Sequence, residues 1–352
     1  MKNTILKLLV GCVKNLTSQR EERSESHFLI ISTTGIGDTL WATPGLKNLK
    51  DTFPRSVVVV VTSLLGKEVL DHNPYIDKLY TIKDPIFFHL FLLYKKLSRY
   101  RFASCVLFHT SQRALLPFVS MLGIPCIIGN VGMHKGLDYL LSHPILPCSA
   151  HHEIERRLAL LKPLGIHSRQ SLLEVYLSEE DYRLPDLLDK DCWIILHPGA
   201  SHTFKQWPKE SYLQLGKELA SQLNARIAIT GNAREALVCT EIANGIPGAI
   251  SLAGIITLRT FAAFCSKANL LITNDTGPMH LAFAQKLPTI AIFSPTNPKI
   301  CGPYHIDNAY PLYEMQTCFP CLGKKCRDPL CLLQISWRQV ADLSIKVYRE
   351  NM

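Results

Sequence analysis

In this 352-residue chain, the residue types that best suit ligand binding stand together at residues 274–280. The segment reads Asn-Asp-Thr-Gly-Pro-Met-His and follows an apolar run. Gly277 lets a ligand approach the backbone, and Pro278 suits a first helical turn. The free N–H groups at the start of such a helix attract phosphate. The segment therefore predicts a seat for a diphosphate, with an ordinary turn capped by Asp275 as the alternative.

Two other polar loops contain side chains that suit the same ligand. The loop 197–208 contains Lys205, whose ammonium group can contact a diphosphate, and Ser201, a hydroxyl donor. Glu235 follows the next apolar run and can accept hydrogen bonds from ribose hydroxyls. Each has a plainer alternative: Lys205 is a solvated surface lysine, and Glu235 is a glutamate at an ordinary helix start. Trp207, in the same loop as Lys205, only anchors the core.

A glycine-rich turn near the start of the chain places a carboxylate beside an expected helix. Gly35-Ile36-Gly37 does not complete a dinucleotide-binding fingerprint, because Leu40 stands where glycine or alanine belongs. Asp38 in this turn can instead remove a proton from a hydroxyl group. The alternative is that Asp38 only caps the helix.

These loops must be positioned by strands. Unalternating apolar runs of this length indicate the buried strands of a parallel sheet, and helical patterns separate them. A first series is expected at residues 27–32, 55–62, 78–82, 104–108 and 126–129, and a second at 193–197, 226–230, 270–273 and 289–293. The sequence therefore predicts an α/β fold with two doubly wound, Rossmann-like domains that face each other across a cleft.

The domain boundaries follow from the same alternation. We expect an amphipathic N-terminal extension at 1–26, a first α/β domain at 27–180 and a second at 181–317. Residues 318–352 then contain a cysteine cluster and a C-terminal helix. The join between the two domains falls in a polar stretch around residue 181.

The N-terminal extension does not have the pattern of a secretion signal. Lys7 interrupts its apolar run, whereas a signal requires roughly 7–15 uninterrupted apolar residues. Its apolar residues suit one side of a helix and its lysines suit anionic lipid headgroups, so we expect a surface-lying anchor or, alternatively, an ordinary core helix. The longest apolar run elsewhere, 86–94, is too short to span a bilayer.

Composition and charge narrow the class of protein. The chain is 47% hydrophobic and 19% charged, which excludes a disordered or fibrous protein. No terminal tail concentrates the net charge of +9. Residues 85–137 contain no Asp or Glu but six Lys or Arg, so this surface should attract anions. We expect no nucleic-acid partner.

The twelve cysteines fall into two groups. Most are scattered through apparent core segments, as Cys105 and Cys265 are, and we expect them to be reduced. Four lie within fourteen residues near the C-terminus and could hold a structural zinc ion, with disulfides or clustered free thiols as the alternatives. These four are Cys318, Cys321, Cys326 and Cys331.

The order of these loops resembles that of the heptosyltransferases of glycosyltransferase family 9. The resemblance rests on four segments and covers nearly all of the chain from about residue 27 onward. These segments are 35–46 around Asp38, 152–165, His197-Pro-Gly-Ala with Lys205-x-Trp-Pro, and 273–280.

The resemblance implies a GT-B fold and inverting transfer of heptose from ADP-heptose to a nascent lipopolysaccharide core. The second domain would hold the nucleotide-sugar donor and the first the anionic acceptor, on the cytoplasmic face of the inner membrane. Asp38 would be the general base, Glu235 would bind ribose, and no divalent metal would be required. Groups implied at the diphosphate are Lys205, Ser201, the Thr276 and Gly277 amides, Asp275 and His280.

Three other functions remain compatible with the residues. The nearest is a family member that uses another nucleotide sugar. A sugar-nucleotide epimerase of the same two-domain shape would convert its donor without any acceptor. A non-catalytic nucleotide-sugar-binding protein would bind the donor without turnover.

Overall fold

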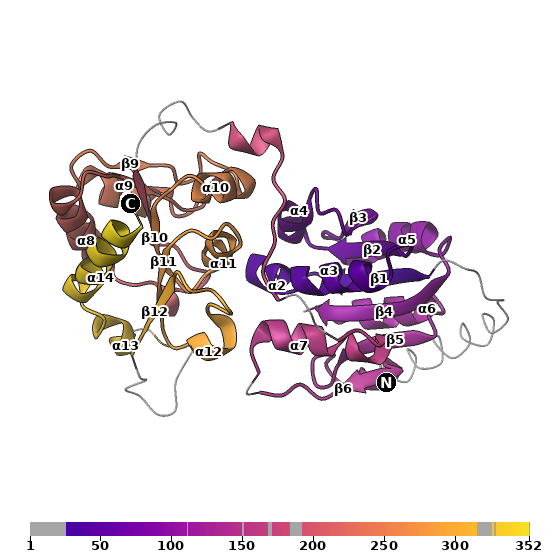
Figure 1. The fold of residues 1–352 in the computed structure, drawn as a ribbon. Helices are drawn as coiled ribbons and strands as arrows, with labels where there is room; N and C mark the ends of the chain where they lie inside the picture. Colours follow the sequence, from indigo (N-terminus) through magenta and orange to yellow (C-terminus); the bar gives the residue numbers. More distant parts are fainter. Residues whose placement is uncertain are drawn as a thin grey trace. The chain divides into compact units, whose positions relative to one another are not determined.

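The computed structural model describes residues 26–110, 112–149, 151–167, 171–183, 192–314, 326 and 329–351. The chain divides between Leu172 and Leu173 into two compact units, here called the N-terminal and C-terminal units. Each is a sheet flanked by helices (Figure 1). The division lies a few residues before the polar stretch around residue 181 in which the sequence suggests the join.

The N-terminal unit is built on a six-stranded parallel sheet of order β3-β2-β1-β4-β5-β6. Residues 57–62 are all Val except for a final Thr, and β2 pairs with β1 in register from His27↔Val57 to Ser32↔Thr62. The strands are β1 (His27–Ser32), β2 (Val57–Thr62), β3 (Lys78–Thr81), β4 (Phe102–His109), β5 (Cys126–Asn130) and β6 (His143–Ile145).

Helices cover this sheet and bury one apolar stripe each against it. Leu90, Leu93 and Leu97, at helical spacing in α5, join the core made by the strands. The helices are α2 (Ile36–Leu40), α3 (Thr43–Thr52), α4 (Leu64–Leu70), α5 (Ile86–Leu97), α6 (Leu115–Met121) and α7 (Glu153–Ala159), with 3-10 turns η1 (Asp138–Leu140) and η2 (Lys162–Leu164).

The C-terminal unit repeats the same topology with different residues. Its six parallel strands have the order β12-β11-β10-β7-β8-β9, which is again two strands on one side of the first strand and three on the other. The strands are β7 (Trp193–His197), β8 (Arg226–Ile229), β9 (Ile250–Ser251), β10 (Leu270–Asn274), β11 (Thr289–Phe293) and β12 (Ala309–Tyr313).

The C-terminal helix packs on this second sheet. In α14 the buried residues Val340, Ala341, Ser344 and Val347 follow helical spacing and belong to, or lie beside, the same core as α8. The helices are α8 (Lys209–Gln222), α9 (Ala236–Asn244), α10 (Leu258–Cys265), α11 (Gly277–Ala284), α12 (Pro298–Cys301), α13 (Leu330–Leu333) and α14 (Trp337–Glu350), with 3-10 turns η3 (Glu179–Tyr182) and η5 (Thr203–Lys205).

Both sheets have a topological switch point, where neighbouring strands lead to helices on opposite sides. It lies between β1 and β4 in the N-terminal unit, and between β7 and β10 in the C-terminal unit. In open α/β sheets ligands bind beyond the carboxyl ends of the strands at such points. The loops that contain Asp38, Lys205 and Asp275 follow these strands directly.

The predicted α/β class and all nine predicted strands are confirmed, most to within two residues. Three strands were missed: β6, β9 and β12. The first and last are edge strands that contain Pro144 and Pro311, and proline weakens a strand signal because it cannot donate to the ladder. The strand β9 has only two residues and no pattern to read.

The described residues include most of the cysteines and all of the assigned helices. Nine described cysteines are free thiols, and Cys105 and Cys265 are buried in the core as predicted. Among the described residues, no helix combines the length and the apolar character needed to cross a bilayer. The expected amphipathic extension at 1–26 lies, except for Ser26, outside the described residues.

Candidate functional site

Asp38 lies in the first turn of α2, directly beyond the carboxyl end of β1. The residue at the N-cap position is Gly35, so the alternative that Asp38 caps this helix is wrong. The carboxylate is partly exposed, and its Oδ1 accepts a hydrogen bond from Arg157 Nη2 at 2.8 Å. Among the described residues Oδ2 has no hydrogen-bond partner, so this oxygen can accept one from a ligand.

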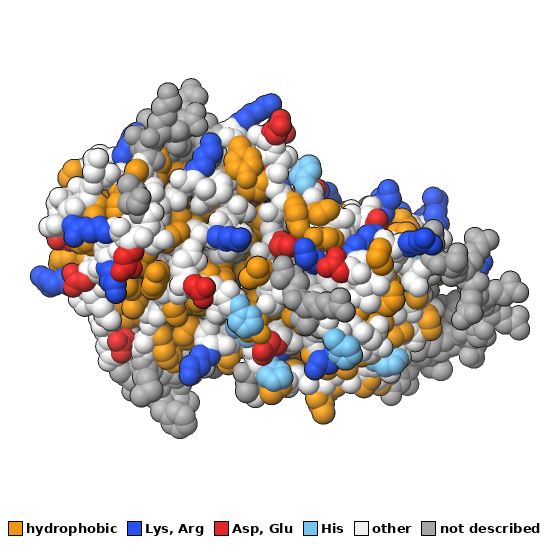
Figure 2. Space-filling model, viewed as in Figure 1, with side chains coloured by type: hydrophobic (Ala, Val, Ile, Leu, Met, Phe, Trp, Pro, Cys, Tyr) orange, Lys and Arg blue, Asp and Glu red, His pale blue; other side chains and the backbone are white. Residues whose placement is uncertain are grey.

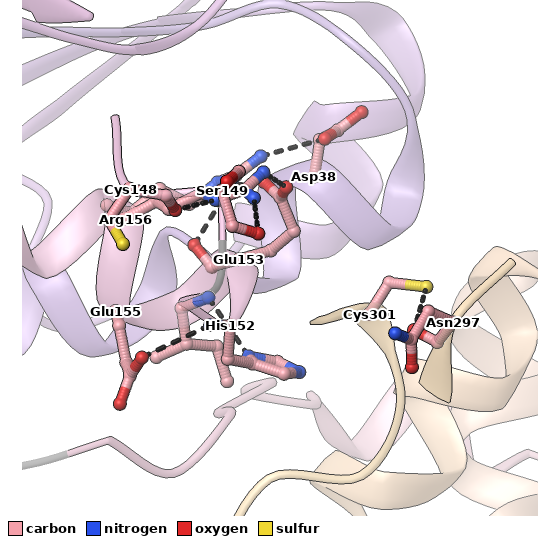
Figure 3. Close-up of polar contacts among 11 residues, drawn as sticks. Asp38, Cys148, Ser149, His152, Glu153, Glu155, Arg156, Asn297 and Cys301 are labelled. Atoms are coloured by element: carbon pink, nitrogen blue, oxygen red, sulfur yellow. Dashed lines mark hydrogen bonds and ion pairs between the residues drawn. The ribbon is translucent and has the colours of Figure 1, made fainter. Parts of the chain in front are cut away.

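Arg157 reaches Asp38 from α7, 119 residues later in the chain. Its guanidinium is buried, and it also bonds Glu153, one turn earlier on the same helix. The charged carbon of Arg157 lies 5.0 Å from the centre of the Trp41 ring. Asp38 on α2 and Glu153 on α7, both labelled in Figure 3, thus bond the same guanidinium. The guanidinium thus fixes the position of the Asp38 carboxylate.

The start of α7 is held in place by an unusual cap. His152 is buried, its Nδ1 accepts a hydrogen bond from Ile154 N at 3.1 Å, and the Glu155 carboxylate accepts from His152 N. Figure 3 shows His152 and Glu155 at this helix start. Arg157 lies in the segment 152–165 that carries the family resemblance, but it was not among the predicted site residues. The signal was present, because Arg157 falls on the stripe of Ile154 and Leu158, and an arginine on a buried face requires a charged partner.

His109 ends β4 across the switch point from Asp38. Its Nδ1 lies 3.0 Å from Thr34 Oγ1. Burial lowers the pKa of His109, the nearby carboxylates of Asp38 and Glu153 raise it, and Arg157 lowers it. Because burial outweighs the carboxylates, His109 is a neutral side chain near pH 7.

The C-terminal unit holds a second buried ion pair at its own switch point. Lys205, at the end of the turn η5 after β7, places its Nζ 2.5 Å from Asp275 Oδ2. Asp275 follows β10, and its Oδ2 also accepts a hydrogen bond from Thr296 Oγ1. The alternative that Asp275 caps α11 is wrong, because Thr276 occupies that position. Sequence reasoning missed Thr296, since no local pattern marks it.

Asn274 connects the two loops that hold this pair. Its side-chain amide donates to the carbonyl oxygens of Pro198 and Gly199, and its Oδ1 accepts from Trp207 N at 3.1 Å. Trp207 is itself buried, with Nε1 donating to Ile335 O at 3.0 Å, so its interpretation as a core anchor is confirmed. One fully buried asparagine thus sets the spacing of the Lys205 and Asp275 loops.

The helix α11 begins where the sequence predicts it. Gly277 is its first residue and Pro278 the second, and the amides of its first turn have no partner within the helix. Thr276 and Gly277 are partly exposed at this end. His280, predicted to line the seat, is buried one turn further along and packs its ring edge-on against Phe283.

Glu235 and Ser201 lie on neighbouring loops of the same edge. Glu235 precedes α9, and its Oε2 accepts from Asn232 N at 2.8 Å. The Glu235 carboxylate also packs against Gly199, where a Cβ would come within 2.3 Å of Oε1. A larger residue at position 199 would therefore displace the Glu235 carboxylate from its present position. Ser201 is exposed in that loop.

His197 is the last residue of β7, as His109 is the last residue of β4. Its Nδ1 lies 3.0 Å from Thr230 Oγ1, and the Tyr212 hydroxyl donates to its carbonyl oxygen. Burial lowers the pKa of His197 to about 4. This side chain is therefore an uncharged structural element of the strand end at neutral pH.

A small cavity lies beyond the ends of β4 and β5 in the N-terminal unit. Its polar lining comes from Thr110, Gln112, Arg113, His134 and Lys135. His134 is buried, burial lowers its pKa, and its Nε2 has no hydrogen-bond partner among the residues that the structure describes. Two cations beside a hydrogen-bonding imidazole suit an anionic group of a ligand.

The four-cysteine cluster is only partly described. Cys318 and Cys321 lie outside the described residues, and the zinc prediction stays a prediction. Cys331 is buried on α13, where its sulfur accepts a hydrogen bond from Ser294 Oγ at 2.6 Å. Within the described part of the chain, no three His, Cys, Asp or Glu residues gather as a metal site would require.

Solved structures of other proteins share the fold of this chain. The chain superposes on a glycosyltransferase family 9 protein from Veillonella parvula with a TM-score of 0.82 and 21% identity, covering 94% of this chain and 100% of that one. It also superposes on an Escherichia coli heptosyltransferase solved with ADP-2-deoxy-2-fluoro heptose, with a TM-score of 0.72, 18% identity, and coverage of 91% and 99%. These likenesses confirm the GT-B fold.

Sequence comparison gives the family. Lipopolysaccharide heptosyltransferase 3 of Escherichia coli is 26% identical over 282 residues, which cover 74% of this chain and 81% of that protein. Residues 92–331, more than half of the chain, match glycosyltransferase family 9 (heptosyltransferase). With the family's motifs at both switch points and its fold in both units, the chain belongs to glycosyltransferase family 9.

Proposed function

We propose that this glycosyltransferase transfers heptose from ADP-heptose to a nascent lipopolysaccharide core, with inversion at the anomeric carbon. The observation that carries the proposal is the Lys205–Asp275 pair, with Nζ and Oδ2 2.5 Å apart, at the start of α11. A fixed ammonium group and a helix N-terminus at one switch point suit the diphosphate of a nucleotide sugar. The heptosyltransferase relatives support heptose as the sugar.

The donor half of the reaction follows from charge. Cleavage of the glycosyl–phosphate bond leaves negative charge on the departing diphosphate, and preorganised cations and amides lower that barrier. Lys205 supplies the cation, and the Thr276 and Gly277 amides supply hydrogen-bond donors. Asp275 would repel a diphosphate if it faced one directly, so we assign it to holding Lys205 in place. Glu235 accepts hydrogen bonds from the ribose, and Ser201 and His280 complete the seat.

The acceptor half of the reaction requires a base. As the acceptor oxygen forms its bond to the anomeric carbon and the bond to phosphate breaks, the hydroxyl proton passes to Asp38 Oδ2. Oδ1 stays with Arg157, which keeps the carboxylate oriented throughout. A single displacement of this kind inverts the sugar configuration, because the acceptor attacks from the side opposite the leaving group.

The acceptor is proposed to be anionic and held by the N-terminal unit. The cavity with Arg113, His134 and Lys135 provides cationic and hydrogen-bonding groups for a phosphate or an acidic sugar. The acid-free stretch 85–137 adds long-range attraction. Because a nascent lipopolysaccharide is a lipid, we also propose that the enzyme works at the cytoplasmic face of the inner membrane.

No divalent metal is required in this proposal, since Lys205 and the amides of α11 provide the positive charge on the diphosphate. Turnover should therefore persist in excess EDTA, and its loss and recovery with added Mg²⁺ would contradict this point. A structural zinc ion at the cysteine cluster is a separate proposal. Its test is the metal content of the purified chain, and less than stoichiometric zinc ends it.

The deciding experiment incubates the protein with a panel of nucleotide sugars and truncated core acceptors and identifies products by mass. The proposal expects one heptose added to the acceptor, only from ADP-heptose. A different sugar in the product indicates a family member with another donor. Conversion of the donor without acceptor indicates an epimerase, and donor binding without any product indicates a non-catalytic binding protein.

A further inference from the structure

The helix α5 exposes large apolar side chains on the side away from the core. Phe87, Phe88 and Phe91 are 77%, 59% and 57% exposed, and Leu92 beside them is also exposed. They are the only phenylalanines among the strongly exposed residues that the structure describes. Solvated apolar side chains that occur singly need no explanation, but four adjacent ones on one helix face mark an interaction surface.

Cations continue this apolar face along the same helix. Residues four apart lie on one side of a helix, so Phe87, Phe91 and Lys95 form one row and Phe88, Leu92 and Lys96 a second. We call these six residues the α5 face. Lys95 Nζ lies 4.7 Å from the centre of the Phe91 ring, and Lys96 Nζ lies 5.6 Å from that of Tyr80 on β3. The apolar half and the cationic half of the face are therefore directly adjacent.

Cations predominate in the sequence around the α5 face. Arg99 and Arg101 follow the helix and are exposed, and no Asp or Glu occurs from residue 85 to residue 137. The nearest carboxylate in the sequence is Asp84, ahead of the helix. In Figure 2 blue Lys and Arg side chains and orange hydrophobic side chains lie side by side over the part of the N-terminal unit where Figure 1 labels α5.

We propose that the α5 face docks the protein on the surface of an anionic phospholipid bilayer. The phenylalanines enter the boundary between headgroups and acyl chains, and the lysines and arginines contact lipid phosphates. A partner protein would be expected to present carboxylates to the cations and a pocket to the rings, whereas a bilayer offers both anionic charge and apolar depth over a broad plane. Twelve residues are too few to span a membrane, so the helix lies along it.

None of the six residues of the α5 face lines the proposed donor seat or the acceptor cavity, although they lie in the stretch 85–137 that attracts the acceptor at long range. The test therefore measures lipid binding and donor binding independently. The full chain is mixed with vesicles of phosphatidylethanolamine and phosphatidylglycerol, and the bound fraction is measured by sedimentation. Phosphatidylcholine vesicles serve as the uncharged reference, and ADP binding is measured by calorimetry.

The double variant Phe87→Ser/Phe91→Ser should bind anionic vesicles at least about tenfold more weakly than the wild type. The matched control is Leu237→Ser, an equally exposed apolar residue of α9 in the C-terminal unit, which should change nothing. Lys95→Glu/Lys96→Glu should weaken binding by roughly tenfold or more on anionic vesicles only. Its control, Lys217→Glu on α8, should have less effect. ADP affinity should be unchanged in all four variants.

Two results would overturn the proposal. One is wild-type binding to anionic vesicles that neither α5 variant weakens beyond its control. The other is wild-type protein that fails to bind them and instead self-associates in sedimentation velocity, with Phe87→Ser/Phe91→Ser monomeric, which would make the α5 face a contact between copies. Loss of turnover on a soluble truncated acceptor with unchanged lipid binding would count against the proposed transferase and leave this inference intact.

Discussion

The two units place a carboxylate and a cation at the same point of the same topology, with the roles reversed. In the N-terminal unit Arg157 is 2% exposed and its partner Asp38 is 27% exposed. In the C-terminal unit the carboxylate of Asp275 is 8% exposed and the cation Lys205 is 17% exposed. Each pair thus has a more buried member and a member that is more accessible to a ligand.

This reversal agrees with the roles proposed for the accessible residue of each pair. Removing a proton requires an accessible carboxylate, and stabilising a diphosphate requires an accessible cation. In each pair the buried partner forms an ion pair with the accessible group and limits its rotation. The buried partner loses its own hydration in doing so. In this proposal a pair is a reactive residue together with its positioning residue, and the predictions for Asp38, Arg157 and Lys205 test this division.

The largest effect is expected at the accessible carboxylate. Asp38→Asn should lower kcat by about 10²–10⁴-fold, because the general base is lost. Affinity for ADP should stay at the wild-type value, since Asp38 has no part in donor binding. Single-turnover kinetics with a truncated acceptor and calorimetry with ADP measure the two quantities. Turnover close to that of the wild type would remove Asp38 from the mechanism.

The buried partner of Asp38 should affect both stability and turnover. Arg157→Leu removes the cation that pairs with Asp38 and one of the two cations that pair with Glu153, and it should lower the free energy of unfolding by about 3–5 kcal/mol. In the folded fraction kcat should fall while KM for the donor is unchanged, and Arg157→Lys should restore part of kcat. The control is Arg156→Leu, which removes the other cation bonded to Glu153 and leaves the Arg157–Asp38 pair in place. A normal kcat in folded Arg157→Leu would show that Asp38 needs no positioning.

The strand-end histidines differ in their surroundings, and this difference predicts a pH effect. Burial holds the pKa of His197 near 4, against 6.5 when it is exposed, so below pH 6.5 the unfolded chain takes up a proton that the folded chain does not. The contribution of His197 to the free energy of unfolding should be fully present above pH 6.5. It should fall by on the order of 3 kcal/mol as the pH drops toward 4. His109 lies among opposing charges and should contribute less.

The His197 prediction is measured by urea unfolding at several pH values between 4 and 7, for wild type, His197→Asn and His109→Asn. The slope of stability against pH should be smallest in His197→Asn. Equal slopes in all three proteins would mean that other groups determine the acid sensitivity.

The smallest effect is expected at the accessible cation. Lys205→Ala should weaken ADP binding by about tenfold to a hundredfold, because one charge-assisted contact to the diphosphate is lost. The matched control is Lys209→Ala on the first turn of α8, whose ammonium pairs with Glu241 at the surface. Calorimetry that gives the same affinity for Lys205→Ala and wild type would contradict the role of Lys205.

Much of the fold could be predicted because its signals are local. The β2 strand is a run of valines, and residues 27–32 and 193–197 are strands with the predicted bounds. The start of α11 was marked by Gly277 and Pro278. Edge strands such as β12 could not be predicted, because half-exposed residues and an internal proline give no period to read.

The site residues also differ in whether a local sequence signal marks them. The residues with accessible functional groups, Asp38 and Lys205, stand in loops whose glycines, prolines and polar side chains mark them in the sequence. No local sequence pattern of this kind marks their partners. Arg157 comes from a helix 119 residues away, and Thr296 from the loop after another strand. Residue type and local order alone therefore determined which groups are available for chemistry.

Only the tertiary structure decided which groups are paired. A parallel sheet brings the carboxyl ends of β1 and β4, or of β7 and β10, to one edge however far apart they are in the chain. Whether a charge near that edge is buried or accessible depends on packing from helices elsewhere in the sequence. The strands could be read from hydrophobic runs, whereas the division into reactive and positioning residues emerged only when these distant segments came into contact.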